Sequence, residues 1–262
     1  MGLFCMLLGI LTERVKERID MKKIGALFDV DGTLYRDSLM VEHFKKMIKY
    51  EIIDPSIWHN EAKQTFHNWD KRQGNYEDYL LEVAQIYINS VKGINRKHME
   101  FMCDQVIATK GERVYVYTRD KIQWHKDQGH TIIFISGGPD YLVEKMAEKY
   151  GVQDFVGTRY HVDSEGILTG EIDQMWDSHS KEEAIKNFQE KYDLDLSKSY
   201  AYGDTNGDIS MLRAVGNPTA VNPVKELLIN IKKDSLLKER VNLVVERKDV
   251  IYKLNTDVEI LD

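Results

Sequence analysis

Three short runs of apolar residues in this chain, at residues 24–28, 131–135 and 200–202, each end abruptly in acidic or glycine-rich sequence. The first run ends at Asp29, the second ends in a serine and two glycines, and the third leads through a glycine to Asp204. Such runs are typical of strands that are buried on both faces of a parallel sheet. Because ligands bind beyond the carboxyl ends of the strands in open α/β sheets, we expect these three ends to meet at one site.

The sequence between and after these runs supports the same fold class. A helix is predicted to begin near Pro139 and to end at Gly151, because apolar residues recur there with helical spacing and glycine is a common C-terminal cap. Residues 156–170 predict a β-hairpin, and residues 218–221 and 241–245 are further candidate strands. The pattern predicts an α/β fold with a doubly wound, Rossmann-like core of mainly parallel strands.

The interval that follows the first predicted strand has a different texture, with helical periodicity, many aromatic residues and little strand character. We therefore predict an α-helical cap at residues 37–129, inserted into a core made of residues 21–36 and 130–262. A cap inserted there would lie above the end of the Asp29 strand, where it can exclude water from a pocket. Five of its aromatic residues are expected mainly in the cap's own core: Trp58, Phe66, Trp69, Tyr76 and Tyr79. Tyr35 and Arg36 could line the pocket or form an exposed turn.

The composition limits the class of partner. The chain has 262 residues, 42% of them hydrophobic, and a formal net charge of -7, which disfavours a broad nucleic-acid or anionic-membrane surface. Two cysteines in no metal-ligand spacing argue against a zinc site or a disulfide framework, so a cytoplasmic location is the default expectation. Residues 1–20 are interpreted as an N-terminal extension, whose apolar run at 3–11 is too short to span a bilayer. The oligomeric state is not predicted.

Four motifs occur in a fixed order along the chain. They are Asp29-Val30-Asp31-Gly32-Thr33, an apolar run that ends in Ser136-Gly137, the single residue Lys181, and Gly203-Asp204-Thr205-Asn206-Gly207-Asp208. In this order the sequence resembles the haloacid dehalogenase superfamily, and in particular its phosphoserine-phosphatase-like subfamily (IB), which has a helical C1 cap after the first motif. The resemblance spans roughly residues 22–223 and implies a Mg²⁺-dependent phosphatase that acts on a small phosphorylated metabolite.

The acids of these motifs suit magnesium and phosphoryl transfer, because Mg²⁺ prefers carboxylate oxygens and a phosphate dianion must be neutralised before attack. The resemblance implies that Asp29 is the nucleophile, which forms an aspartyl-phosphate, and that Asp31 is the general acid and base. Asp29 and Asp204 are the expected carboxylate ligands of the metal, and Asp31 adds its backbone carbonyl. Asp208 is expected to support the metal from a second layer of residues.

The other two motifs are expected to hold the transferring phosphate. Ser136 and the backbone amide of Gly137 lie in a loop before a predicted helix N-terminus, where phosphate oxygens bind well. Lys181 would balance the charge of the acids and of the phosphoryl group. An alternative for the acidic segments is a pair of calcium loops, but neither completes an EF-hand pattern.

The sequence departs from phosphoserine phosphatases at two places, since Gly32 stands where they usually carry serine and Ser38 stands where they carry a glutamate that binds the substrate amine. Both departures argue against phosphoserine as the substrate. Three further functions remain open at this stage: a phosphotransferase or phosphomutase that uses the same aspartyl-phosphate, a non-hydrolytic protein that binds a phosphate ligand, and a cap that docks another protein.

Overall fold

The computed structural model describes residues 22–261, and the proposed extension at 1–20 lies outside them. One sheet of eight strands runs through this part of the chain in the order β4-β3-β2-β1-β5-β6-β7-β8. The strands are β1 (Gly25–Phe28), β2 (Thr131–Pro139), β3 (Asp154–Val162), β4 (Leu168–Asp173), β5 (Tyr200–Gly203), β6 (Asn217–Val221), β7 (Asn242–Arg247) and β8 (Val250–Leu254). The six strands from β3 to β7 in this order are parallel, and the two outer strands are antiparallel.

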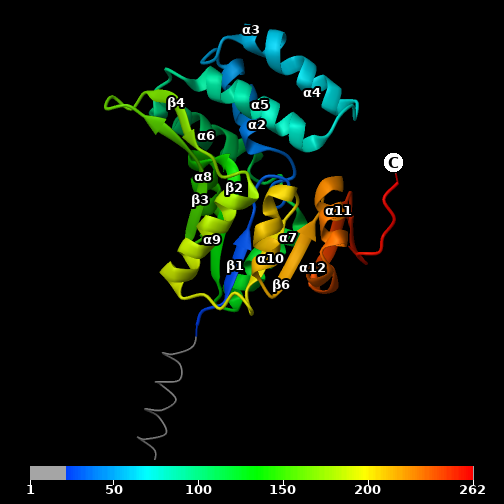
Figure 1. The fold of residues 1–262 in the computed structure, drawn as a ribbon. Coiled ribbons are helices and arrows are strands. Elements are labelled where there is room, and N and C mark those ends of the chain that lie inside the picture. The colour runs from blue at the N-terminus through cyan, green and yellow to red at the C-terminus, as the bar shows by residue number, and fades with distance from the viewer. Residues whose placement is uncertain (1–21, 262) are drawn as a thin grey trace, which may run out of the picture.

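Strand β1 lies at the centre of the sheet because all four of its residues are apolar or small and are completely buried. Phe28 is level with Phe134 of β2 on one side and with Tyr202 of β5 on the other. The three strands therefore end at the same edge, as the sequence predicts, and this edge faces the top of the molecule in Figure 1.

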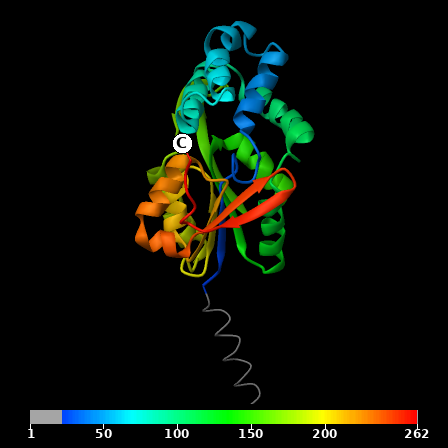
Figure 2. The same ribbon diagram turned by 90° about the vertical axis from the view of Figure 1, so that its right-hand side faces the viewer.

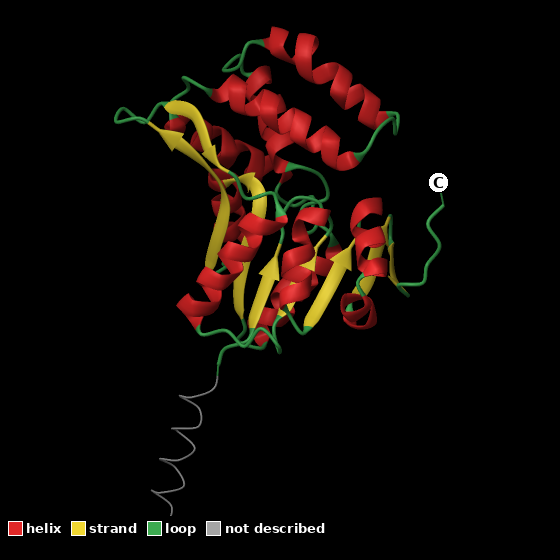
Figure 3. Ribbon diagram, viewed as in Figure 1, coloured by secondary structure: helices red, strands yellow, loops and turns green. Residues whose placement is uncertain are grey.

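Helices cover both faces of the sheet, so the predicted doubly wound α/β fold is confirmed (Figure 3). The helices α7 (Val116–Asp127) and α8 (Asp140–Tyr150) pack on the face that buries Phe28 and Phe134. The opposite face, which buries Leu27 and Ile133, is covered by α9 (Ser178–Tyr192), α10 (Ile209–Ala214), α11 (Lys225–Lys233) and α12 (Ser235–Arg240). Each face is thus sealed by its own apolar cluster.

The remaining helices form a cap above the strand ends, as Figures 1 and 2 show. They are α2 (Leu39–Lys49), α3 (Pro55–Ile57), a π-helical turn η1 (Trp58–Ala62), α4 (Lys63–Asp70), α5 (Tyr76–Val91) and α6 (Arg96–Lys110). Helix α7 also lies within the range 37–129 that the sequence assigns to the cap, yet it packs against β2. The domain boundaries at residues 36 and 129 stay a prediction.

A buried chain of hydrogen bonds ties the cap to the core. Nε2 of His43 in α2 donates to the carbonyl of Met99 in α6 over 3.1 Å, which leaves Nδ1 to accept from the hydroxyl of Tyr87 over 2.9 Å. Tyr87 in α5 in turn lies 2.8 Å from the hydroxyl of Tyr141 in α8. This chain of hydrogen bonds therefore links three cap helices to one core helix through the neutral side chain of His43.

The antiparallel pair β3 and β4 is the predicted hairpin. The sequence pattern does not predict strand β8, because four of its five residues are exposed and no buried residues alternate with them. Within residues 22–261 no helix is long and apolar enough to cross a membrane.

Candidate active site

The centre of the candidate site is an aspartate that continues the ladder of the central strand. The backbone N–H of Asp29 donates to the carbonyl of Tyr202 over 3.0 Å, so its position is fixed by the sheet. Its Oδ1 accepts a 2.9 Å bond from Nζ of Lys181, which reaches over from α9. Lys181 also contacts Oδ1 of Asp208 at 2.5 Å and the carbonyl of Ile135 at 3.2 Å. The predicted association of these residues from separate motifs is therefore present.

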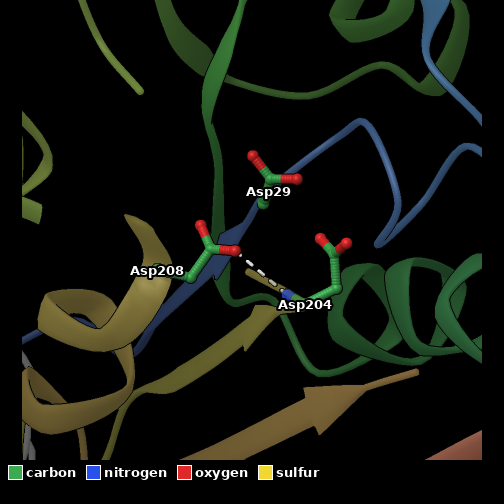
Figure 4. Close-up of side chains that lie close together, drawn as sticks. All are labelled: Asp29, Asp204 and Asp208. Atoms are coloured by element: carbon green, nitrogen blue, oxygen red, sulfur yellow. Dashed lines mark hydrogen bonds between the residues drawn. The ribbon is translucent and has the colours of Figure 1, made fainter. Parts of the chain in front are cut away.

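Asp208 holds the loop that follows β5. It closes a 3₁₀ turn, Asn206–Asp208, and its Oδ2 accepts bonds of 3.0 Å from the backbone N–H groups of Asp204 and Thr205. Figure 4 shows the bond to the N–H of Asp204. Both oxygens of Asp208 thus have protein partners, as expected for a residue that supports its neighbours.

Asp204 faces the first motif and is held by it. The hydroxyl of Thr33 donates to Oδ1 of Asp204 over 2.8 Å. Gly32 takes a left-handed backbone with φ +83°, and a Cβ at this position would lie 2.0 Å from Oδ2 of Asp204. A larger residue at position 32 would displace the carboxylate, so the glycine that departs from the phosphoserine phosphatase pattern has a steric reason in this chain.

The site has more buried negative than positive charge. One carboxylate oxygen from each of Asp29, Asp204 and Asp208 lies within 4.8 Å of the others, and Figure 4 shows the three side chains together. Lys181 is the one cation that bonds to this cluster in the described residues. Burial raises the pKa of Asp29 to about 7, although Lys181 opposes the rise, and burial together with the charge of Asp29 raises the pKa of Asp204.

A divalent cation would relieve this imbalance. Within residues 22–261 no hydrogen bond reaches Oδ2 of Asp29 or Oδ2 of Asp204, so each carboxylate keeps an oxygen for a ligand. Carboxylate oxygens that converge from neighbouring strand ends are the donors that Mg²⁺ prefers. The residues present therefore fit a magnesium ion.

Asp31 is held by the first turn of the cap. Its Oδ2 accepts from the hydroxyl of Ser38 and its Oδ1 from the backbone N–H of Leu39, both over 3.0 Å. Burial raises the pKa of Asp31 to about 6, and these two hydrogen bonds oppose the rise. Ser38 is also the N-terminal cap of α2. Its hydroxyl is thus committed to Asp31 and to the helix rather than to a substrate amine.

The predicted phosphate loop closes the other side of the site. Ser136 ends the buried part of β2, its Oγ accepts from the N–H of Gly138 over 3.3 Å, and the carbonyl of Gly137 accepts from Thr158 over 2.8 Å. A Cβ on Gly137 would lie 2.8 Å from Cβ of Trp176, so this loop has no room for a side chain.

These predicted residues share one small cavity of about 100 Å³. Its polar lining includes Asp29, Asp31, Ser136, Gly137 and Lys181, and its apolar lining from the cap is Met40, Leu80, Leu81 and Ala84. Asp204 lines a second, larger cavity of about 920 Å³.

The larger cavity uses cap residues that the sequence places in the cap's own core. Trp69 and Tyr76 pack with Tyr79, as predicted, but they also line this cavity. Of the two residues left open, Arg36 lines the cavity and Tyr35 is buried.

One contact across the site has no signal in the sequence. Glu77, in the first turn of α5, accepts a 2.7 Å bond from the backbone N–H of Asn206 in the Asp204 loop. An acidic residue in the first turn of a helix is common, because it interacts well with the helix dipole, and so it does not mark a contact to another motif.

The fold and the site together define a capped α/β hydrolase with buried aspartates at the ends of two neighbouring strands. The family model of haloacid dehalogenase-like hydrolases matches residues 26–213, and the chain belongs to this family. Within it, the chain is a phosphoric monoester hydrolase of the phosphoserine-phosphatase-like group.

Several known proteins are similar to this chain. The inhibition of morphological differentiation protein of Streptomyces azureus is 27% identical over 80% of this chain and 76% of its own length. A histidinol-phosphatase of Neisseria meningitidis is 23% identical over 77% of this chain and 91% of its own length. Among solved structures, a substrate-bound phosphoserine phosphatase has a TM-score of 0.58 at 22% identity, over 88% of this chain and 96% of that one. This last likeness concerns the fold.

Proposed function

We propose that this enzyme hydrolyses a small phosphomonoester, with Mg²⁺ as its cofactor and with an aspartyl-phosphate formed on Asp29. The observation that carries the proposal is the bond of Lys181 to both Asp29 and Asp208, because it leaves Oδ2 of Asp29 without a hydrogen bond in the described part of the chain. Asp29 lines the small cavity that the predicted phosphate loop also lines.

The chain supplies the positioning and the charge balance that phosphoryl transfer needs. The phosphate would bind between the Ser136-Gly137 loop and Lys181, with one oxygen of Asp29 below it. Asp29 and Asp204, with the backbone carbonyl of Asp31, would hold Mg²⁺. The ion neutralises phosphate oxygens when it is bound.

Asp29 would attack phosphorus, and the bond between phosphorus and the ester oxygen would break. Asp31 would give its proton to that departing oxygen, since burial raises its pKa and favours the protonated form. It would then take a proton from the water that hydrolyses the aspartyl-phosphate, which returns Asp29 to its free carboxylate. Ser38 and the N–H of Leu39 would hold the acid in place throughout.

The test is hydrolysis of p-nitrophenyl phosphate with Mg²⁺ by the wild type and by the Asp29→Asn variant. We expect at least about a 1,000-fold loss, because the amide is a poor nucleophile. The matched control is Asp249→Asn, an exposed aspartate in the turn before β8, which should retain wild-type activity. Equal rates for Asp29→Asn and wild type would show that Asp29 is not the nucleophile.

Metal dependence is tested by removal and return. Dialysis against EDTA should abolish hydrolysis, and added Mg²⁺ should restore it, because Asp29 and Asp204 would otherwise present their charges to an anionic substrate. Full activity in EDTA would contradict the role of the ion. If an alcohol increased the yield of a phosphorylated acceptor at the expense of free phosphate, the enzyme would instead be a phosphotransferase.

A further inference from the structure

The larger cavity, of about 920 Å³, is lined by two arginines from different parts of the chain, Arg36 and Arg72, and by Lys225. Arg36 belongs to the segment that joins β1 to the cap, and Arg72 belongs to the turn between α4 and α5. Asp204, an expected magnesium ligand, also lines this cavity, so a group bound here would be part of a ligand that extends from the metal centre.

Each arginine is held by an aromatic ring rather than by an acid. The guanidinium of Arg72 lies 4.5 Å from the ring centroid of Trp69, and that of Arg36 lies 5.5 Å from the ring centroid of Tyr115. Within residues 22–261 neither guanidinium forms an ion pair or a hydrogen bond. Stacking orients the planar group and leaves its N–H edges available to an anion.

The backbone around both arginines is fixed. Arg72 takes a left-handed conformation with φ +59°, and its N–H donates to the carbonyl of Trp69 over 2.8 Å. Trp69 is itself stacked on Tyr79, with ring centroids 5.7 Å apart. The N–H of Arg36 donates to the carbonyl of Arg113 over 2.9 Å. These contacts hold the backbone at both positions.

Three of the four acids that line the same cavity accept hydrogen bonds from N–H or O–H groups. Glu77 accepts from Asn206, Asp204 accepts from Thr33, and Asp37 accepts from the N–H of Ser38 over 3.0 Å. Glu226 lies beside Glu77, and its charge contributes to the raised pKa of Glu77, for which burial is the larger cause. Asn75, which caps the sixteen-residue helix α5, lies on the cavity wall as well and adds the positive end of a helix dipole.

We propose that the larger cavity binds a second anionic group of the substrate, and that this group, a carboxylate or a phosphate on the leaving group, bridges Arg36 of the core side and Arg72 of the cap. The inference rests on the proposed function, because it assumes that the first phosphate occupies the Asp29 cavity. It names the substrate class as phosphomonoesters that carry another acidic group. An unpaired arginine on a surface is ordinary, but two that line one cavity offer two guanidinium groups to an anionic ligand.

The test compares phosphate esters that differ in the charge of the leaving group. One pair is 6-phosphogluconate and glucose 6-phosphate, and another is fructose 1,6-bisphosphate and fructose 6-phosphate. Dissociation constants are measured by calorimetry with Mg²⁺ on the Asp29→Asn variant, so the result does not depend on turnover. A failure of this proposal is thereby separate from a failure of the proposed nucleophile.

In at least one pair the more acidic ligand should bind about 10- to 100-fold more tightly, the size of a pair of charge-assisted hydrogen bonds. Arg36→Gln and Arg72→Gln, each added to Asp29→Asn, should remove this preference. The double change should cost little more than either alone, because one anion needs both arginines. Lys71→Gln, at the exposed neighbour of Arg72, is the matched control and should leave the preference intact.

Three results would overturn the proposal. The neutral member could bind as well as the acidic member in both pairs, or the arginine variants could leave the preference unchanged. Alternatively, a cationic ester such as histidinol phosphate or phosphoethanolamine could bind more tightly than every acidic ligand, which would assign the cavity to its carboxylates. Thermal unfolding of each variant shows whether the fold is retained.

Discussion

The floor of the site and the wall of its larger cavity are built by different means. The floor comprises Asp29, Lys181, Asp204 and Asp208, which are at most 5% exposed and hydrogen-bonded to one another or to the backbone. The wall comprises Arg36, Trp69, Arg72 and Tyr76, which are partly or fully exposed and are held mainly by contacts between rings and cations.

We expect this difference to separate the residues that catalyse the reaction from the residues that select the substrate. Asp29 and Asp204 follow directly after strands, and Lys181 and Asp208 are hydrogen-bonded to them, so the floor has the fixed geometry that phosphoryl transfer requires. The wall lies on cap helices, on a turn between them and on the segment that joins β1 to the cap, where a side chain can change without disturbing the sheet. We therefore expect changes in the floor to affect every substrate, and changes in the wall to affect some substrates and not others.

Lys181→Met should disrupt the charge balance of the floor and give the largest loss of activity. It removes the cation that neutralises Asp29 and Asp208, so the rate constant for p-nitrophenyl phosphate should fall about 100- to 1,000-fold. Lys186→Met, on the exposed side of the same helix, is the control. A loss of less than tenfold with Lys181→Met would mean that the floor does not depend on this charge.

His43 tests the buried network between cap and core. Burial lowers the pKa of His43 to about 4, whereas a histidine in the unfolded chain titrates near 6.5. Between these values the unfolded state binds the proton and the folded state does not, so stability falls as the pH is lowered from about 6.5 to about 4. The shift corresponds to about 3 kcal/mol.

Urea unfolding at several pH values should show this dependence in the wild type and less of it in His43→Asn. The slopes are compared rather than the absolute stabilities, because the variant loses hydrogen bonds at every pH. His125, whose pKa burial also lowers, is present in both proteins and cancels in the comparison. Parallel curves would show that His43 is not the group that titrates.

Substitution of alanine for two glycines, Gly32 beside Asp204 and Gly74 in the cap, compares the two regions directly. Gly32 and Gly74 both have left-handed backbones, with φ +83° and +90°, but a Cβ on Gly74 meets nothing within 4 Å. Gly32→Ala and Gly74→Ala should each lose about 1–2 kcal/mol of unfolding free energy from backbone strain. Only Gly32→Ala should also lose activity, by at least about tenfold, since it displaces Asp204. Equal activities of Gly32→Ala and Gly74→Ala would show that Gly32 has no steric role at the site.

Glu77→Ala should give the smallest effect, because it removes one hydrogen bond between the cap and the Asp204 loop. We expect kcat/KM to fall about 3- to 10-fold, which corresponds to a bond of about 1 kcal/mol. Glu77→Gln keeps an acceptor and should lose less, and Glu82→Ala on the exposed side of α5 should lose nothing. The contact has no role in the site if Glu77→Ala and Glu82→Ala behave alike.

The sheet and its acids could be predicted because their signals are local. A strand buried on both faces must be apolar throughout, and its end is marked where Asp29 interrupts it. Parallel strands then bring Asp204 to the same edge without any further information. The roles of all the site residues remain predictions, although the structure places Asp31, Ser136 and Gly137 beside Asp29 in one cavity.

Other features depend on contacts that no local pattern records. Ser38 bonds to Asp31 because the chain turns back between them, and seven residues of separation do not specify that turn. The sequence of helix α7 has the same helical periodicity as the cap, and only its packing on β2 shows that it lies beside the sheet. Trp69 and Tyr76 pack against each other within the cap and also line the larger cavity. The sequence favours only the first of these two roles, a place in the core of the cap.

The hydrogen bonds between the start of α2 and Asp31 make the orientation of this carboxylate depend on the position of the cap. Both carboxylate oxygens of Asp31 are bound by Ser38 and Leu39 at the very start of this helix. If α2 moved away from the core, Asp31, the proposed proton donor, would lose both partners, while Asp29 would stay fixed by the sheet. Such a movement would leave the proposed nucleophile without an oriented proton donor.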